Sequence, residues 1–119
     1  MTIEKIIDQT FPRSARLTTP EDFKTVFKKA NKLYFNEFTV YVLRNNRSES
    51  RLGLAISKKS VKKAVSRNRI KRIIRDSFRL RRHKLAGWDI VFVSRFAATQ
   101  LSNTELKAIT SKVWKRLKS

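Results

Sequence analysis

The side chains best suited to chemistry in this chain are cations, and they gather in one stretch. Residues 58–84 hold 13 of the 29 lysines and arginines but only one of the nine acids, Asp76. At about 100° per residue, this stretch divides into an apolar stripe and a nearly opposite polar stripe. The apolar stripe consists of Ile70, Ile73, Ile74, Ser77 and Phe78, and the polar stripe consists of Asn68, Lys71, Arg72, Arg75 and Arg79. The stretch therefore predicts a helix that buries one side and offers a row of cations on the other.

The polar stripe carries the hydrogen-bonding groups that nucleic acids require. Asn68 lies at its centre, and a side-chain amide can bond phosphate, ribose or base edges. Arg67 and Arg69 flank it, and a guanidinium group binds phosphate oxygens through two parallel hydrogen bonds. We therefore interpret this helix as a binding surface for a polyanion.

A solvated helix face is the ordinary interpretation of a charged stretch, and the scarcity of acids argues against it here. Ordinary surface helices carry i,i+4 ion pairs, which need acids that this stretch lacks. Arg75, Arg79 and Arg82 instead repel one another along one edge. The whole chain shares this imbalance, with a formal net charge of +20 over 119 residues. Such repulsion opposes compaction unless a polyanion relieves it, which points to nucleic acid or to an anionic membrane.

Composition also limits the class of protein and its compartment. The chain has no cysteine, which rules out a disulfide framework and a thiolate metal site. No apolar run approaches the roughly 20 residues of a membrane span, and residues 1–11 are too acidic for a signal peptide. We therefore expect a cytoplasmic protein with no membrane association.

Catalysis by the protein itself finds little support among the remaining residues. His83 is the only histidine, so a metal site with several histidine ligands is excluded. Asp76 and Asp89 each stand without a second carboxylate nearby in sequence, which acid–base or metal chemistry would require. Ser57 and Lys58 are more simply the end of a predicted strand than a nucleophile and its base. We expect no catalytic residue and no metal site in the protein alone.

Three aromatic residues, Phe23, Phe27 and Tyr41, admit two interpretations. Phe23 and Phe27 share the apolar face of a predicted helix, where aromatic residues normally belong to the core. A sheet that carries aromatic residues beside a basic helix can also stack single-stranded bases. The residues alone leave both interpretations open.

Capping signals and periodicity predict three helices. In the first, Thr19 is a suitable N-cap and Pro20 a suitable first residue. The helix of the basic stretch bends or begins late, because the apolar residues within 61–65 lie off its apolar stripe. The last helix begins with a capping box formed by Ser102 and Glu105.

Strands are expected over residues 33–43, 51–57 and 88–94. The last of these is apolar on both faces, which predicts a central position in a sheet. Residues 1–15 are expected to form a loosely ordered arm. The order of elements predicts one α+β domain over residues 1–119, with helices packed against a single sheet. A right-handed sense is the default for the strand–helix–strand link.

The basic stretch also resembles a known family. Residues 64–72, Ala-Val-Ser-Arg-Asn-Arg-Ile-Lys-Arg, closely resemble the Arg-Asn-Arg helix of the bacterial ribonuclease P protein family. Three further segments agree with that family in the same order, and they lie within residues 16–27, 52–59 and 88–93. The resemblance extends over most of the chain, roughly from residue 13 to residue 117.

The resemblance implies a particular version of the predicted fold. The family has a two-layer sandwich with the element order αβββαβα, which it shares with a ribosomal-protein domain. Its βαβ crossover is left-handed, against the default stated above.

The resemblance also implies a function. The chain would be the protein subunit of ribonuclease P, monomeric when free, which binds the catalytic RNA and the 5′ leader of precursor tRNA. Removal of the leader would depend on Mg²⁺ held mainly by the RNA, with no organic cofactor. The RNA-binding residues implied by the resemblance are Lys58, Lys59, Arg67, Asn68, Arg69, Lys71, Arg72, Arg75 and Arg79. The leader-binding cleft would be lined by Arg16, Phe23, Phe27 and Tyr41.

Two other functions compete with this one. The first is a ribosomal or general double-stranded-RNA-binding protein with no role in an enzyme. The second is a stand-alone metal nuclease, which the lack of clustered carboxylates disfavours.

Overall fold

The helices and strands follow the predicted order, except that residues 33–43, expected to form one strand, belong to two strands separated by residues 35–37. The computed structural model describes residues 12–85 and 87–117. Its elements are η2 (Arg13–Ala15), α1 (Pro20–Lys29), β1 (Asn31–Tyr34), β2 (Phe38–Arg44), β3 (Arg51–Ala55), α2 (Ala64–Arg81), β4 (Trp88–Ser94), η3 (Phe96–Gln100) and α3 (Asn103–Leu117). The order of α-helices and strands is αβββαβα, which confirms the α+β class.

The four strands form one mixed sheet in the order β1-β2-β4-β3. β2 pairs antiparallel with β1 and β4, whereas β3 and β4 are parallel and are joined through α2. The central position of β4 confirms the prediction from its sequence. Val91 and Phe92 of this strand are both fully buried, and they belong to the cores on opposite faces of the sheet. The left-handed sense of the crossover stays a prediction.

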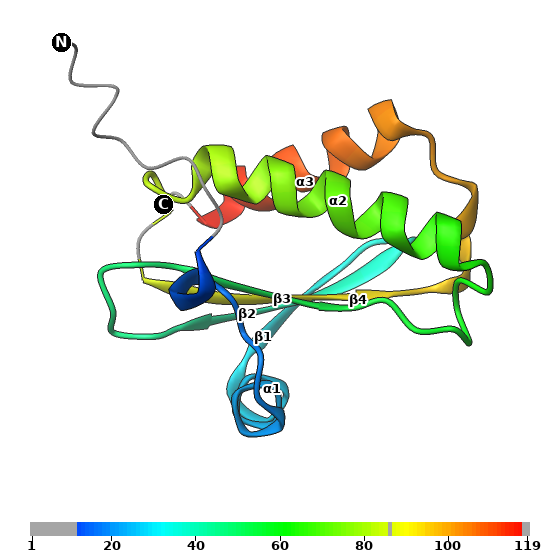
Figure 1. Cartoon of the computed structure of the whole chain (residues 1–119). Helices are drawn as coiled ribbons and strands as arrows, with labels where there is room; N and C mark the ends of the chain where they lie inside the picture. Colours follow the sequence, from blue (N-terminus) through cyan, green and yellow to red (C-terminus); the bar gives the residue numbers. More distant parts are fainter. Residues whose placement is uncertain (1–11, 86, 118–119) are drawn as a thin grey trace, which may run out of the picture.

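Helices cover both faces of the sheet. Figure 1 shows α2 and α3 side by side on one face and α1 on the other. Under α2 and α3, the Trp114 ring packs against Phe78 and Phe92 with centroid distances of 5.8 and 5.7 Å. Under α1 lies a smaller cluster around Val26 and Val91. The predicted two-layer sandwich therefore corresponds to the sheet with α2 and α3. Helix α1 forms a further layer on the opposite face, because β4 is apolar on both faces. No helix within the described ranges combines the length and the apolar character that crossing a membrane requires.

Helix α2 begins late, as predicted, because the residues before it are held by other contacts. Val61 is fully buried in the larger core, and its N–H donates to the carbonyl of Ser57 at 2.9 Å. Arg67 reaches back from the helix, and its Nη1 donates to the carbonyl oxygens of Val61 at 3.0 Å and Lys62 at 2.8 Å. The guanidinium group thereby fixes the path by which the chain enters α2.

Helices α1 and α3 begin with the predicted caps. In α1, the hydroxyl of Thr19 accepts the N–H of Asp22 at 3.1 Å. In α3, Ser102 Oγ accepts the N–H of Glu105 at 3.1 Å, and Glu105 Oε1 accepts the N–H of Ser102 at 2.9 Å. The pKa of Glu105 is lowered because its carboxylate accepts the backbone N–H of Ser102. Both caps are local interactions, which is why sequence alone predicted them.

The predicted arm over residues 1–15 lies largely outside the described residues, which begin at 12. The part that is described differs from a loose arm. Residues 13–15 form a 3₁₀ turn, and Ala15 is fully buried. The N–H of Leu17 donates to the carbonyl of Leu52 at 2.9 Å. The segment ahead of α1 is therefore fixed against the edge strand β3.

A buried ion pair joins β3 to β4 and extends to α1. Arg51 donates from Nε to Asp89 Oδ1 at 2.9 Å and from Nη2 to Asp89 Oδ2 at 2.6 Å. Its Nη1 lies 3.6 Å from Asp22 Oδ2 of α1, and Asn45 donates to Asp89 at 2.8 Å. The pKa of Arg51 is raised, chiefly by the hydrogen bonds to Asp89. Asp89 looks like an isolated acid in the sequence because its partner is 38 residues away.

Asp89→Asn should lower the free energy of unfolding by about 3 kcal/mol, because it leaves the charge of Arg51 without its buried partner. The Asp76–Arg79 pair, 3.5 Å apart and largely exposed, offers a matched control. Asp76→Asn should change the free energy of unfolding by less than about 1 kcal/mol. Urea unfolding followed by circular dichroism measures both. Equal losses in the two variants would contradict the importance of the buried pair.

Candidate nucleic-acid interface

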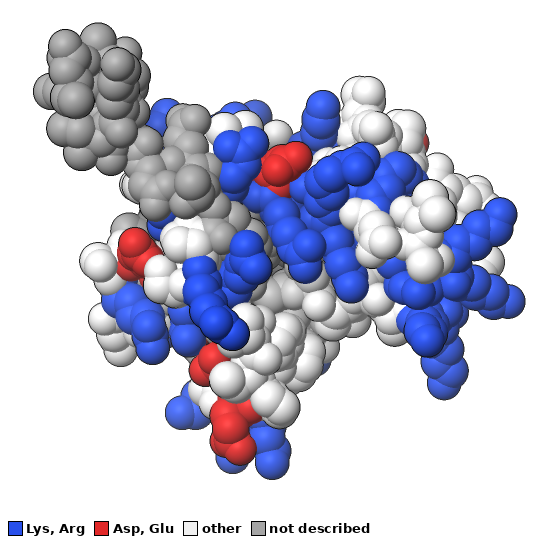
Figure 2. Space-filling model, viewed as in Figure 1, with Lys and Arg blue, Asp and Glu red and all other residues white. Residues whose placement is uncertain are grey.

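The cations of α2 follow one side of the helix. Asn68, Arg72 and Arg75 are exposed, and Lys71 is half-buried. The residues Ile70, Ile73, Ile74 and Phe78 on the other side are all buried. Figure 2 shows the resulting surface, where lysine and arginine side chains run across the molecule with few acids among them. The predicted division of this helix into an apolar and a polar side is confirmed.

The two arginines that flank Asn68 are also bonded within the protein. Arg67 holds the turn before α2, as described above. Arg69 donates from Nη1 to Asn103 Oδ1 at 2.9 Å, which links α2 to the start of α3. A guanidinium group has five N–H donors, so each arginine keeps donors for a phosphate. Sequence reasoning found the cations and missed these internal bonds.

The repulsion predicted among Arg75, Arg79 and Arg82 is wrong for two of these three arginines. Arg82 is only 5% exposed, and its Nη1 lies 3.5 Å from Glu49 Oε1. Arg79 Nε lies 3.5 Å from Asp76 Oδ1. Glu49 belongs to the segment before β3, so the spacing of residues along the helix could not predict its ion pair with Arg82. Arg75 has no ion pair among the described residues, and it remains available to an external anion.

Lys58 and Lys59 lie in the turn after β3, and both are exposed. Hydroxyl groups hold this turn in place. Ser57 Oγ and Ser60 Oγ are 2.9 Å apart, and the Thr99 hydroxyl of η3 donates to the carbonyl of Ser60 at 3.1 Å. The turn therefore presents two ammonium groups from a fixed position close to the start of α2.

The aromatic residues of α1 and β2 form a row on the other face of the sheet. The ring centroids of Phe23 and Phe27 are 6.1 Å apart, and Phe27 meets Tyr41 edge-on at 4.8 Å. Phe27 is 40% exposed, whereas Phe23 and Tyr41 are half-buried. Lys32 Nζ lies 5.5 Å from the ring centroid of Tyr41, in cation–π range. Val26 rather than Phe27 supplies the buried core of α1, so the aromatic row lines an open surface.

The basic and aromatic sets meet in one small cavity, which we call the junction cavity. Arg16, Phe23 and Arg75 line it, together with Leu17, Thr18, Leu52 and Leu54, and its volume is about 180 Å³. Two of these residues come from the predicted cleft, and Arg75 comes from the polar stripe of α2. No sequence pattern related them. The structure thus makes the two predicted sites continuous.

Sequence reasoning missed a row of side chains beside the aromatic residues. Strand pairing aligns Tyr34, Thr39, Val93 and Ala55 across the four strands. Alternation along β1 and β2 places this row on the same face as Tyr41. Tyr34 is 69% exposed. The period-two pattern of β1 was the signal that would have found it.

Gly53 of β3 allows α1 to approach the sheet closely. A Cβ atom at this position would lie 2.8 Å from Phe23 Cε1 and 3.2 Å from Leu17 Cβ. Both distances are shorter than ordinary van der Waals contact. Only glycine leaves the Phe23 ring in its observed place.

Comparisons with known proteins agree with one another. The family model described as Ribonuclease P matches residues 11–118. The chain is 48% identical over 111 residues to the ribonuclease P protein component of Thioalkalivibrio sulfidiphilus, covering 93% of this chain and 92% of the relative. It is 45% identical over 107 residues to that of Aliivibrio fischeri, covering 90% and 92%.

Solved structures show the same likeness. The RNase P protein of Staphylococcus aureus superposes with a TM-score of 0.79 at 30% identity, covering 86% of this chain and 94% of that protein. The RNase P protein of Thermotoga maritima superposes with a TM-score of 0.70 at 30% identity, covering 87% and 94%.

Gly53→Ala should lower the free energy of unfolding by about 1–3 kcal/mol, because the added methyl group displaces the Phe23 ring. In a Phe23→Ala background the same substitution should be clearly less destabilising, since the ring that the added methyl group would displace is absent. A double-mutant cycle measured by urea unfolding gives the difference. Strictly additive losses would show that Phe23 is not the group displaced.

Proposed function

This chain belongs to the ribonuclease P protein family, and from that membership we propose how it acts within the ribonucleoprotein. As a ribonuclease P protein component, it is a subunit of an endoribonuclease that matures tRNA 5′ ends together with an RNA subunit. In our proposal the polar stripe of α2, with Lys58 and Lys59, contacts the catalytic RNA. The cleft lined by Phe23, Phe27 and Tyr41 holds the single-stranded 5′ leader of precursor tRNA. The free protein is a cytoplasmic monomer that needs no organic cofactor.

The junction cavity is the observation that carries this proposal. Arg75 reaches it from the polar stripe of α2, and Arg16 and Phe23 reach it from the cleft. A single strand stacked on the aromatic row would therefore run beside an RNA bound along α2. At the junction, guanidinium groups would neutralise phosphates of both strands where they converge.

We assign the chemical step to the RNA subunit. Mg²⁺ bound there supplies metal-assisted hydrolysis of the phosphodiester bond. Asp22 and Asp89 do not fit a metal site, because Arg51 pairs with both carboxylates. The part of the protein is to position the leader and to reduce the repulsion between two polyanions, which favours Mg²⁺ binding by the RNA.

Reconstitution tests the proposal. Added to ribonuclease P RNA, the protein should raise precursor-tRNA cleavage at low Mg²⁺, where the RNA alone is limited by phosphate repulsion. If about five phosphates are contacted, log affinity should fall against log salt with a slope of roughly −3.5 to −4.5. A general double-stranded-RNA binder would give a salt slope without stimulating cleavage. A stand-alone nuclease would cut precursor tRNA with Mg²⁺ and no added RNA.

Charge-matched variants locate the contacts in the same assay. Arg75→Gln removes a cation at the junction cavity, and Lys112→Gln removes an exposed cation of α3. The first should make the salt slope shallower by roughly 0.7–0.9, and the second should leave it unchanged. Equal slopes for both variants would argue against contact at the junction.

Phe27→Ala should weaken the affinity of the reconstituted enzyme for a precursor with a long leader by about ten-fold, because one base–aromatic contact is lost. A precursor whose leader is a single nucleotide should be bound almost as before. Phe96→Ala is the control, since Phe96 is 68% exposed but belongs to η3. Fluorescence titration with precursors of graded leader length measures each affinity. A loss independent of leader length would place the leader elsewhere.

A further inference from the structure

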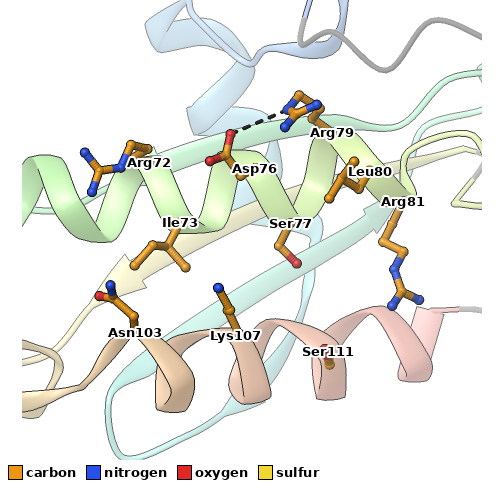
Figure 3. Close-up of a pocket in the computed structure, with 10 residues that line it drawn as sticks. All are labelled: Arg72, Ile73, Asp76, Ser77, Arg79, Leu80, Arg81, Asn103, Lys107 and Ser111. Atoms are coloured by element: carbon orange, nitrogen blue, oxygen red, sulfur yellow. Dashed lines mark hydrogen bonds and ion pairs between the residues drawn. The ribbon is translucent and has the colours of Figure 1, made fainter.

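A second hollow lies between α2 and α3, and the proposed function makes no use of it. Figure 3 shows the two helices running in the same direction, with Ile73 and Ser77 of α2 facing Asn103 and Lys107 of α3. The volume of the hollow is about 550 Å³. Small-molecule sites typically measure about 300–1,000 Å³. The junction cavity is lined by Arg75, which this hollow does not include, so the two lie along different flanks of α2.

Two of the residues that α2 contributes to the hollow are apolar, Ile73 and Leu80. Ile73 is 7% exposed, and Leu80 is 50% exposed. A single exposed leucine is ordinary on a protein surface. Here, however, Leu80 lies in a concave site, where its exposed side chain offers an apolar contact to one face of a base.

Cations line the hollow as well. Arg72, Arg81 and Lys107 all line the hollow, and none of them has an ion pair within residues 12–85 and 87–117. The carboxylate of Asp76 is also at the border, where Arg79 pairs with it. Figure 3 shows Arg81 extending from α2 toward α3. The hollow therefore suits a ligand that combines an apolar ring with a negative charge.

Hydrogen-bonding groups in the hollow are fixed by their neighbours. Asn103 Oδ1 accepts from Arg69 at 2.9 Å, so the amide N–H groups of Asn103 can donate to a different partner. Ser77 Oγ accepts from Trp114 Nε1 at 2.8 Å, which leaves its own hydroxyl proton to donate. With the carboxylate of Asp76 as an acceptor, the site offers both donors and an acceptor to the edge of a base.

We propose that this hollow binds one unstacked nucleotide of the RNA that lies on α2. The base packs against Leu80, and its phosphate is bound by Arg72 and Lys107. The proposal rests on the proposed function, because Arg72 belongs both to the polar stripe of α2 and to the border of the hollow. An RNA strand that contacts Arg72 in the polar stripe therefore lies next to the hollow. The RNA would then contact α2 on both flanks.

Two matched pairs of variants test this in the reconstituted ribonucleoprotein. Leu80→Ala should weaken the affinity for ribonuclease P RNA by about five-fold, because apolar area of the hollow is lost. Val65→Ala, which shortens a 79% exposed residue of the same helix outside the hollow, should leave the affinity unchanged. Lys107→Gln should make the salt slope shallower by roughly 0.7–0.9, and Lys112→Gln should not. Circular dichroism verifies that each variant is folded.

A photocrosslink identifies the occupant. With Leu80→p-benzoylphenylalanine in the full chain, irradiation of the ribonucleoprotein should crosslink the protein to one unpaired nucleotide. A crosslink to a second protein chain, or none to RNA, overturns the inference. So does an affinity of Leu80→Ala equal to that of Val65→Ala, and in that case the proposed function still stands if the wild-type chain stimulates cleavage. Failure of the wild-type chain to bind the RNA overturns both.

Discussion

Helix α2 has to bury one side and keep cations on the other, and the rest of the structure depends on this division. Ile70, Ile73, Ile74 and Phe78 each contribute roughly 1.5–3 kcal/mol by leaving water, which offsets the repulsion among the exposed cations. The first turns of the helix are fixed by Arg67, which bonds the segment before α2, and by Arg69, which bonds α3. A rigid helix keeps its cations at constant spacing, and fixed spacing is what a phosphate backbone requires of its partner.

Three acids of the described part of the chain form ion pairs within the protein. Asp89 pairs with Arg51 in the sheet, Glu49 with the buried Arg82, and Asp76 with Arg79. Cations that would destabilise the interior are therefore neutralised at short range. Arg72, Arg75 and the lysines of the turn after β3 are left for an external partner. A protein with a net charge of +20 folds in this way without losing its attraction for polyanions.

Strand β4 lies between the two proposed binding surfaces and packs against both. Its Phe92 packs beneath α2 and α3, and its Val91 packs beneath α1. The ion pair of Arg51 with Asp89, extended to Asp22, ties α1 to the same strand. The aromatic row and the cationic helix are thus attached to opposite faces of one rigid element. Both contribute to the junction cavity, where Arg75 approaches Phe23.

The sequence by itself determined the features that depend on interactions between residues close together in the chain. The caps of α1 and α3, the late start of α2, its two sides and the two apolar faces of β4 all follow from local spacing, which fixes helical or strand periodicity. The family resemblance rested on such local runs as well. The polar stripe is therefore legible in the sequence alone, and its role in RNA binding stays a prediction.

Only the tertiary structure decided which distant residues meet. Periodicity placed Phe27 and Val26 on one helix face but could not say that Val26 is buried and Phe27 open, because that depends on how α1 approaches Gly53. The pairing of Asp89 with Arg51, and the meeting of Arg16 with Arg75, join residues far apart in the chain. The hollow between α2 and α3 likewise needs both helices in place. Such contacts depend on packing in three dimensions, which the spacing of residues along the chain does not reveal.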